Sequence, residues 1–254
     1  MSSRSGNFLD CLDVSAQCGE SRERAKRWHK PVTVVAENPA GAKQVVKTYP
    51  SFVFPLAQYF QMLARHEYRM LKAVEGLPFT PSEVYRCADC SEAIQYQYVD
   101  GVSLKELARR GDVPNDFFMK LYASVQQMHK SGVVHFDLGN SGNVLCSPAG
   151  EPKIIDFGSA VFFRLLPGVI GDWARKKDRM GVLKLWYRFD RDSMPREMQV
   201  YYQANYRKNI YTPKRFLKAL KRSLMKPTQA TAEALPMAAI FGLFFGLLAL
   251  VSLV

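Results

Sequence analysis

The stretches His135-Phe136-Asp137-Leu138 and Ile154-Ile155-Asp156-Phe157-Gly158 decide the fold of this chain. The first follows a glycine-terminated helical run and the apolar pair Val133-Val134. The second closes an apolar strand that begins after the turn Ser147–Gly150. Each aspartate leaves a short strand, and a tight hairpin is predicted between them. Two carboxylates placed in this way suit a site that holds a metal-bound substrate beside an acceptor hydroxyl.

Hydrophobic periodicity and turn residues organise the chain before these stretches. Residues 1–29 are polar and unpatterned, which predicts a mobile arm. The elements predicted after the arm are strands over Val32–Val35 and Gln44–Thr48, a helix over Leu56–Val74, a strand over Ala93–Val99, a helix from a Ser103/Glu106 capping box to Gly111, and a helix capped by Asn115 that ends before Gly132.

A glutamate falls on the apolar face of the helix predicted over 56–74. This residue, Glu67, lies between Leu63 and Met70 on that face. A carboxylate turned toward a core is costly unless a cation meets it. The nearest candidate is Lys47, which ends the preceding strand. The sequence therefore predicts a Lys47–Glu67 ion pair between strand and helix, and the alternative is a Glu67 at the helix edge that faces water.

These residues, taken in order, resemble the protein-kinase-like superfamily over about 35–190. The matching positions are Lys47, Glu67, the connecting strand Tyr96–Asp100, His135-Phe136-Asp137, Asn143 and Asp156-Phe157-Gly158. The chain looks more like the compact microbial branch, which includes small RIO-like and lipopolysaccharide-sugar kinases, than like a regulated eukaryotic kinase. The resemblance implies an α+β, bilobal fold with a β-rich N-lobe over 30–99 that holds one helix, and a helical C-lobe over 100–205.

The resemblance also implies ATP and Mg²⁺ as cofactors and gives the matching residues their tasks. Asp137 would accept or orient the proton of the acceptor hydroxyl. Asp156 would bind the Mg²⁺ that bridges the β- and γ-phosphates, and Asn143 would serve a second metal site. Lys47 would neutralise the α- and β-phosphates, with its direction fixed by Glu67.

Further positions have supporting tasks by the same resemblance. Tyr96 and Tyr98 on the connecting strand would border the nucleotide. His135 is expected to brace its own loop rather than to carry a proton. Asp178, on the helical run over 178–187, would brace that loop from below, or would be a plain surface acid.

The chain departs from the family pattern around the phosphates. No G-x-G-x-x-G precedes Lys47, so the phosphate lid is missing, reshaped or made by the turn Asn38–Gly41. Asn143 lies six residues after Asp137, whereas the family spacing is five. Asn140 is therefore a rival metal ligand.

Further departures lie in and after the two loops. Phe136 replaces the arginine that reads a phosphorylated activation loop, and Gly139 replaces the lysine of Ser/Thr kinases. No Ala-Pro-Glu follows Gly158. The apolar run over 161–170 that follows instead could be core, or could dip into a bilayer and collect an amphiphilic acceptor.

The net charge of +12 points to an anionic partner such as a nucleotide or acidic lipid, and no recognition motif for nucleic acid accompanies it. Eight Lys or Arg and no acid lie between Tyr201 and Thr231. This basic segment, over 206–233, predicts an amphipathic helix at an anionic membrane surface. Cys87 and Cys90 form one C-x-x-C without a second pair, which favours free thiols in a turn over zinc.

The tail over 234–254 predicts a membrane anchor. Its last 20 residues carry no charge, and as a helix they would span about 30 Å, the thickness of a hydrocarbon core. The basic flank places the preceding domain on the cytoplasmic side, in a bacterial cell at the inner membrane. Gly242 and Gly246 could pair two such helices in a homodimer.

Two functions remain open from the sequence. The leading hypothesis is a membrane-anchored ATP-dependent kinase that phosphorylates a hydroxyl on a protein or on a lipid-linked sugar. The alternative is a catalytically inactive kinase-like scaffold at the membrane, which the missing glycine-rich loop and the shifted Asn143 would support.

Overall fold

The computed structural model describes residues 30–38, 40–50, 56–86, 93–163 and 168–206. The chain divides into two units, Met1–Gln203 and Ala204–Val254. The arm over 1–29, Cys87, Cys90 and the chain from residue 207 onward, including Gly242 and Gly246, lie outside the described residues. Among the residues that are described, no helix is both long and apolar enough to cross a membrane.

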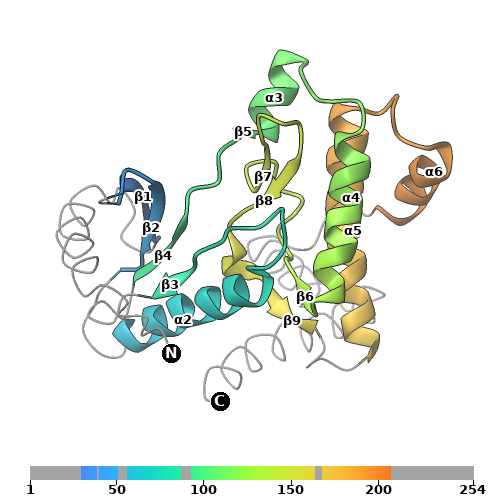
Figure 1. Cartoon of the computed structure of the whole chain (residues 1–254). Coiled ribbons are helices and arrows are strands. Elements are labelled where there is room, and N and C mark those ends of the chain that lie inside the picture. The colour runs from blue at the N-terminus through green and yellow to red at the C-terminus, as the bar shows by residue number, and fades with distance from the viewer. Residues whose placement is uncertain (1–29, 39, 51–55, 87–92, 164–167, 207–254) are drawn as a thin grey trace, which may run out of the picture. The chain divides into compact units, whose positions relative to one another are not determined.

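The first part of the fold is a four-stranded antiparallel sheet in the order β1-β2-β4-β3 (Figure 1). The strands are β1 (Val32–Glu37), β2 (Lys43–Thr48), β3 (Tyr85–Arg86) and β4 (Ala93–Gln97). Strand β2 is internal, with Lys47 opposite Thr33 of β1 and Ile94 of β4. The predicted strands are confirmed, but β4 ends two residues before the predicted Val99.

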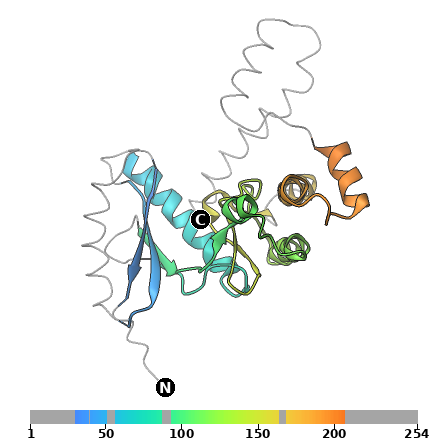
Figure 2. The ribbon, with the colours of Figure 1, turned by 90° about the horizontal axis from the view of Figure 1, so that it is seen from above.

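Helix α2 (Leu56–Val74) has the bounds that its periodicity predicts. Figure 2 shows it lying along one face of the sheet. Its buried face includes Phe60, Met70 and Val74, and Glu67 lies on the same face, so the helix carries one carboxylate into the core. Helix α2 also contacts the single turn η1 (Phe157–Ser159) that follows Asp156.

The second part of the fold is mainly helical. Its elements are α3 (Leu104–Arg110), α4 (Phe117–Lys130), α5 (Gly168–Phe189), α6 (Arg196–Asn205), β5 (Val102–Ser103), β6 (Val133–Val134), β7 (Val144–Cys146), β8 (Pro152–Ile154) and β9 (Val161–Phe162). Helices α4 and α5 pack side by side (Figure 1), and Phe118 of α4 stacks on Trp186 of α5 with ring centroids 5.7 Å apart. This α+β arrangement, a sheet followed by helices, agrees with the predicted class.

The helix caps are confirmed at α3 and wrong at α4. Ser103 accepts a hydrogen bond from the Glu106 N–H, and α3 ends at Gly111 with a left-handed φ of 78°. Helix α4 was expected to be capped by Asn115, but the cap position is Asp116, without a side-chain cap bond. The cause is a turn in which the Phe117 N–H donates to the Pro114 carbonyl, so the regular helix starts one residue later than predicted, at Phe117.

Two strand pairs position the loops that carry the aspartates. The predicted hairpin is present: β7 pairs with β8 around a turn in which Ser147 Oγ accepts from the Glu151 N–H. Strand β6 pairs with β9, so the chain before His135 lies beside the chain after Gly158. The apolar run over 161–170 is not uniformly core, because Val169 at the start of α5 is 84% exposed.

Candidate active site

Lys47 lies between two carboxylates. Its Nζ is 2.8 Å from Glu67 Oε1 and 2.8 Å from Asp156 Oδ1. The Glu67 side chain is fully buried and that of Lys47 is 8% exposed, whereas that of Asp156 is 52% exposed. The predicted ion pair between Lys47 and Glu67 is confirmed, and the structure adds Asp156 to form a lysine–carboxylate cluster of these three residues.

The charges in this cluster support one another. Burial alone would lower the pKa of Lys47, but attraction by Glu67 and then by Asp156 outweighs it, so this pKa is raised. Burial alone would raise the pKa of Asp156, but the ammonium of Lys47 outweighs it, so this pKa is lowered. Since one ammonium faces two carboxyl groups, the exposed side of Asp156 can stabilise a further cation.

Tyrosines border the cluster. The Tyr49 hydroxyl donates a hydrogen bond to Glu67 Oε2, and burial raises the pKa of Tyr49, with a further contribution from Glu67. Tyr96 is buried on β4, and burial raises its pKa too, with Glu67 the next contributor. The Tyr98 N–H donates to the Lys43 carbonyl, 3.0 Å away, which ties the end of β4 to the start of β2. Tyr96 therefore faces the cluster, while Tyr98 lies at the opposite end of β2 from Lys47.

The loop over 155–160, called here the Asp156 loop, passes close to α2. Asp156 has a left-handed φ of 64°, a conformation that costs a non-glycine residue about 1–3 kcal/mol. A Cβ added to Gly158 would lie 3.3 Å from Glu67 Oε2, so glycine gives the loop its close approach to the cluster. Helix α2 holds the loop further along, where His66 Nε2 is 2.7 Å from the Ala160 carbonyl.

The loop over 135–143, called here the Asp137 loop, rests on a buried carboxylate of α5. Asp178 accepts hydrogen bonds from the His135 and Phe136 N–H groups, both at 2.7 Å, and is 1% exposed. Phe136 adopts a φ of 66°, which is unusual for a bulky residue. The prediction that Asp178 braces this loop is confirmed, and the two bonds are what hold the strained turn at Phe136.

His135 joins the two loops. It is fully buried, and its Nε2 lies 3.0 Å from the Ile155 carbonyl while the Asp137 N–H points to its Nδ1 at 3.3 Å. Both contacts fit the neutral ring with its proton on Nε2. The ring also packs edge-on against Phe157, with centroids 4.9 Å apart. His135 is therefore an internal brace, as predicted.

Asp137 is exposed and is held by two asparagines. Asn143 Nδ2 donates to Asp137 Oδ2 at 2.9 Å and to the Asp137 carbonyl at 3.2 Å. Asn140 Nδ2 donates to Asn143 Oδ1 at 3.2 Å. Asn143 is buried, and its carbonyl accepts from the Ile155 N–H beside Asp156, whereas Asn140 is exposed. Asn143 therefore lies between the two aspartates, and the Asn140 side chain contacts it.

A lysine from α5 contacts the Asp137 loop at Gly139. Lys184 Nζ donates to the Gly139 carbonyl at 2.8 Å. The loop comes so close to α5 that a Cβ on Gly181 would lie 2.9 Å from the Gly139 nitrogen. A cation therefore lies beside the Asp137 loop although Gly139 carries no side chain.

The turn before β2 lies at the opposite end of that strand from Lys47. It precedes β2, and Lys47 lies four residues after Lys43, about 13 Å further along the strand. The Asn38 side chain is used within its own turn, where Oδ1 accepts from the N–H groups of Ala40 and Ala42.

The oxygen ligands present fit Mg²⁺. Asp156 offers a half-exposed carboxylate and Asn143 an amide oxygen, both of the hard type that Mg²⁺ prefers, and Mg²⁺–nucleotide sites commonly use one or two protein carboxylates with phosphate and water. Within the described residues no group of three or more His, Cys, Asp or Glu side chains is gathered for a metal.

Three contributors to the site were not anticipated from the sequence. Tyr49 follows Lys47 by two residues and so shares its side of the strand, a signal that was available. His66 directly precedes Glu67 on α2, and the prediction for this part of the helix considered only Glu67. Lys184 lies on the same helix as Asp178, but only the packing of α5 against the loop shows what it contacts.

Comparison with known proteins gives a partial relationship. No family model matches the chain. The chain is 34% identical over 97 residues to the serine/threonine-protein kinase PknD of Chlamydia trachomatis serovar D, an alignment that covers 31% of this chain and 10% of the chlamydial protein. The PknD proteins of serovar A and serovar L2b match over the same length at 34% and 33% identity.

This chain thus aligns with about a tenth of the length of the curated relatives that it matches. Together with the lysine–carboxylate cluster and the two aspartate loops, the partial similarity suggests a distant relationship to the protein-kinase-like superfamily.

Proposed function

We propose that this protein is an ATP- and Mg²⁺-dependent kinase with a compact bilobal fold, an N-lobe over 30–99 and a C-lobe over 100–205. One observation carries the proposal: Lys47 of β2 contacts both Glu67 of α2 and Asp156 of the following loop. Kinases use this combination of strand lysine, helix glutamate and metal-binding aspartate to hold nucleotide phosphates. The acceptor is a hydroxyl, on a protein Ser or Thr or on a lipid-linked sugar.

The first task of the site is to hold the phosphates. Lys47 neutralises phosphate oxygens, and Glu67, buried and bonded by Tyr49, keeps the ammonium directed into the site. Asp156 and Asn143 hold the metal, which when bound supplies positive charge to the phosphate oxygens. The ammonium of Lys47 lowers the pKa of Asp156 and so keeps its carboxylate ionised, the form in which Asp156 would hold that metal.

The second task is to receive the acceptor. Asp137 is exposed at the end of its loop, and the amide of Asn143 fixes one of its carboxylate oxygens. In this position Asp137 can orient the acceptor hydroxyl and take its proton. Lys184, bonded to the Gly139 carbonyl, adds positive charge beside the loop where the acceptor and the transferring phosphate meet.

The site is held together without a phosphorylated activation loop. Phe136 stands where the family has the arginine that reads such a phosphate, and its backbone is fixed by Asp178 instead. This favours the compact microbial branch of the superfamily, with RIO-like and lipopolysaccharide-kinase-like members.

The proposal extends to a membrane location. The basic segment over 206–233 would lie on anionic lipids, and the tail over 234–254 would span the membrane with the kinase on the cytoplasmic side, in a bacterium at the inner membrane. Pairing through Gly242 and Gly246 would make a homodimer. The support is the sequence pattern alone: eight basic residues followed by 20 uncharged ones.

The alternative function is an inactive scaffold that retains nucleotide binding but does not transfer a phosphoryl group. The missing glycine-rich sequence before Lys47 favours this alternative. The test is ATP turnover by the full-length protein with Mg²⁺, comparing Lys47→Met with Lys43→Met. Both lysines lie on β2, but Lys43 is exposed at its start, so its loss changes the net charge equally and leaves the cluster intact. Turnover that is lost in Lys47→Met and kept in Lys43→Met supports the kinase. Equal turnover in both variants contradicts it.

A further inference from the structure

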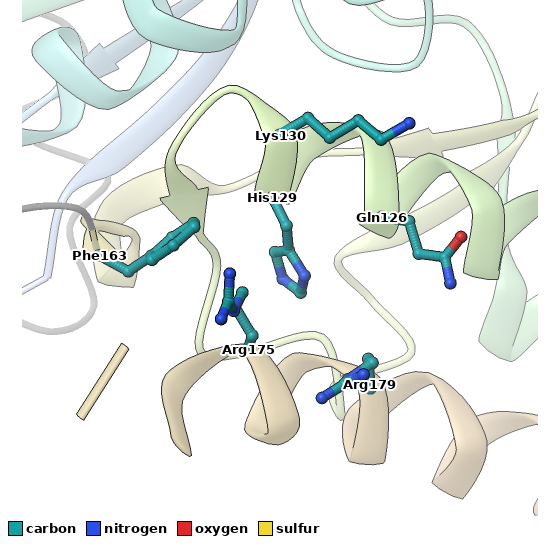
Figure 3. Close-up of a pocket in the computed structure, with 6 residues that line it drawn as sticks. All are labelled: Gln126, His129, Lys130, Phe163, Arg175 and Arg179. Atoms are coloured by element: carbon teal, nitrogen blue, oxygen red, sulfur yellow. The ribbon is translucent and has the colours of Figure 1, made fainter. Parts of the chain in front are cut away.

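A cavity of about 430 Å³ lies between α4 and α5, and its residues are separate from the proposed kinase site (Figure 3). It has the size of a small-molecule site. Figure 3 shows side chains from the two helices on facing sides, with Phe163 closing one end. The lining residues are Gln126, His129, Lys130, Phe163, Arg175 and Arg179.

Helical spacing explains why cations gather here. Gln126, His129 and Lys130 lie three and four residues apart on α4, and Arg175 and Arg179 lie four apart on α5. Residues at these spacings share a helix face. Because α4 packs against α5, the polar side chains of α4 meet the two arginines of α5 at one cavity.

Positive side chains outnumber acidic ones among the residues that line this cavity. None of the six lining residues is acidic, and three of them carry fixed positive charge. Arg175 pairs with Asp172 and lies over the Phe163 ring, 4.9 Å from its centroid. Within the described part of the chain, Arg179 has no ion pair or hydrogen bond. Arginines at (i, i+4) repel one another, so the arrangement costs stability unless an anion is present.

His129 extends the site inward. It is buried, lines the cavity, and its Nε2 lies 3.1 Å from Asp178 Oδ2. Its ring is held edge-on against Phe163, with centroids 6.3 Å apart. A fixed imidazole thus lines the cavity, and the Gln126 amide adds a further hydrogen-bonding group from α4.

From this geometry we propose that the cavity is a binding site for a phosphate monoester or diphosphate group. Guanidinium groups bind such oxygens by paired hydrogen bonds, and an ammonium adds charge without fixed geometry. Arg179 is the principal ligand because it has no partner among the described residues, and Arg175 joins it from the next turn of α5. The phosphate belongs either to a soluble small molecule or to the headgroup of an anionic lipid. This inference does not depend on the kinase proposal.

The test measures binding, not activity, on the full-length protein in mild detergent. Inorganic pyrophosphate is titrated by calorimetry into the wild type, Arg179→Gln and Arg109→Gln. Arg109 is exposed on α3, so its replacement removes the same charge at a place away from the cavity. Loss of one charged hydrogen-bonding partner should weaken binding at least tenfold in Arg179→Gln, and Arg109→Gln should match the wild type. The two variants binding alike, or no binding by the wild type, would overturn the proposal.

A second measurement excludes a folding defect. Since Arg179 is repelled by its neighbour and has no partner among the described residues, Arg179→Gln should melt at the wild-type temperature or above it when no phosphate is added. A lower melting temperature would assign Arg179 a structural role and contradict the proposal.

Two further arms distinguish the source of the phosphate. One uses vesicles of phosphatidylcholine with phosphatidic acid, and the other uses glycerol 3-phosphate in solution. Tighter binding to the vesicles that depends on Arg179 supports a lipid headgroup, and binding of glycerol 3-phosphate that depends on Arg179 supports a soluble ligand. Vesicle binding that is equal in both variants, with no soluble binding, would show surface attraction only and overturn the site.

Discussion

Replacing Lys47 by methionine removes the ammonium that separates two carboxylates. Glu67 is fully buried and would face Asp156 without a cation, whereas Asp156 is half exposed and can be solvated. Breaking a buried pair by removing one partner costs about 3–5 kcal/mol of folding free energy, because an uncompensated charge remains inside the protein. The exposed side of Asp156 lessens the cost, so we expect about 3 kcal/mol, at the low end of that range.

The double variant Lys47→Met/Glu67→Gln separates this cost from a simple loss of packing. Without a carboxylate on α2, the missing ammonium leaves no buried charge unpaired, and the amide oxygen that replaces the carboxylate can still accept from Tyr49. The two substitutions should therefore couple, with the double variant more stable than the sum of the single effects by about 1–3 kcal/mol.

Urea unfolding followed by tryptophan fluorescence measures these free energies, since Trp186 is buried at the α4–α5 contact. Lys43→Met on the same strand is the control and should change stability by no more than about 0.5 kcal/mol. If the single effects of Lys47→Met and Glu67→Gln add within about 0.5 kcal/mol, the buried pair does not exist as described.

Other parts of the site give separate predictions. Tyr49→Phe removes a hydrogen bond to a buried carboxylate and should lower the free energy of unfolding by about 1.5–3 kcal/mol, measured by urea unfolding; an unchanged value would place Glu67 elsewhere. In Asp178→Asn the amide oxygen can accept from only one of the two N–H groups, so hydrogen exchange at His135 and Phe136 should accelerate. The control Asp172→Asn on the same helix should leave both amides as protected as in the wild type. Burial lowers the pKa of Lys177 from 10.5 to about 8. Between these two pH values the unfolded chain binds the proton and the folded chain does not, so stability should rise with pH, and Lys177→Met should flatten that rise in a denaturation series from pH 8 to 10.5.

The part of the site that could be predicted from the sequence is the part governed by local rules. Glu67 lies on the apolar face of a strongly periodic helix, and the cost of burying its charge required a cation, which Lys47 supplies. The hairpin between the aspartates followed from turn residues and short apolar strands. Helix and strand bounds were within two residues for the strongly periodic elements, but the helical run predicted over 178–187 begins ten residues earlier, at Gly168 of α5.

What could not be predicted depends on how separate segments pack. The different positions of Asn140 and Asn143 depend on the backbone path of the Asp137 loop, in which the Asn143 carbonyl accepts from the Ile155 N–H. Lys184 and the cavity between α4 and α5 arise from the contact of helices distant in sequence. The failed cap at Asn115 has a local cause, since the turn after Pro114 competed with the start of the helix.

The measurement that tests the kinase account most directly compares Asp137→Asn with Asp156→Asn in the full-length protein, by ATP binding and ATP turnover with and without Mg²⁺. Asp156→Asn should lose the Mg²⁺-dependent part of ATP binding, because the carboxylate that holds the metal is gone. Asp137→Asn should bind ATP as the wild type does and turn it over about 10² to 10⁴ times more slowly, the effect of a lost general base. An equal Mg²⁺-dependent shift in melting temperature with ATP in all three proteins, together with unchanged turnover in Asp137→Asn, would contradict the account.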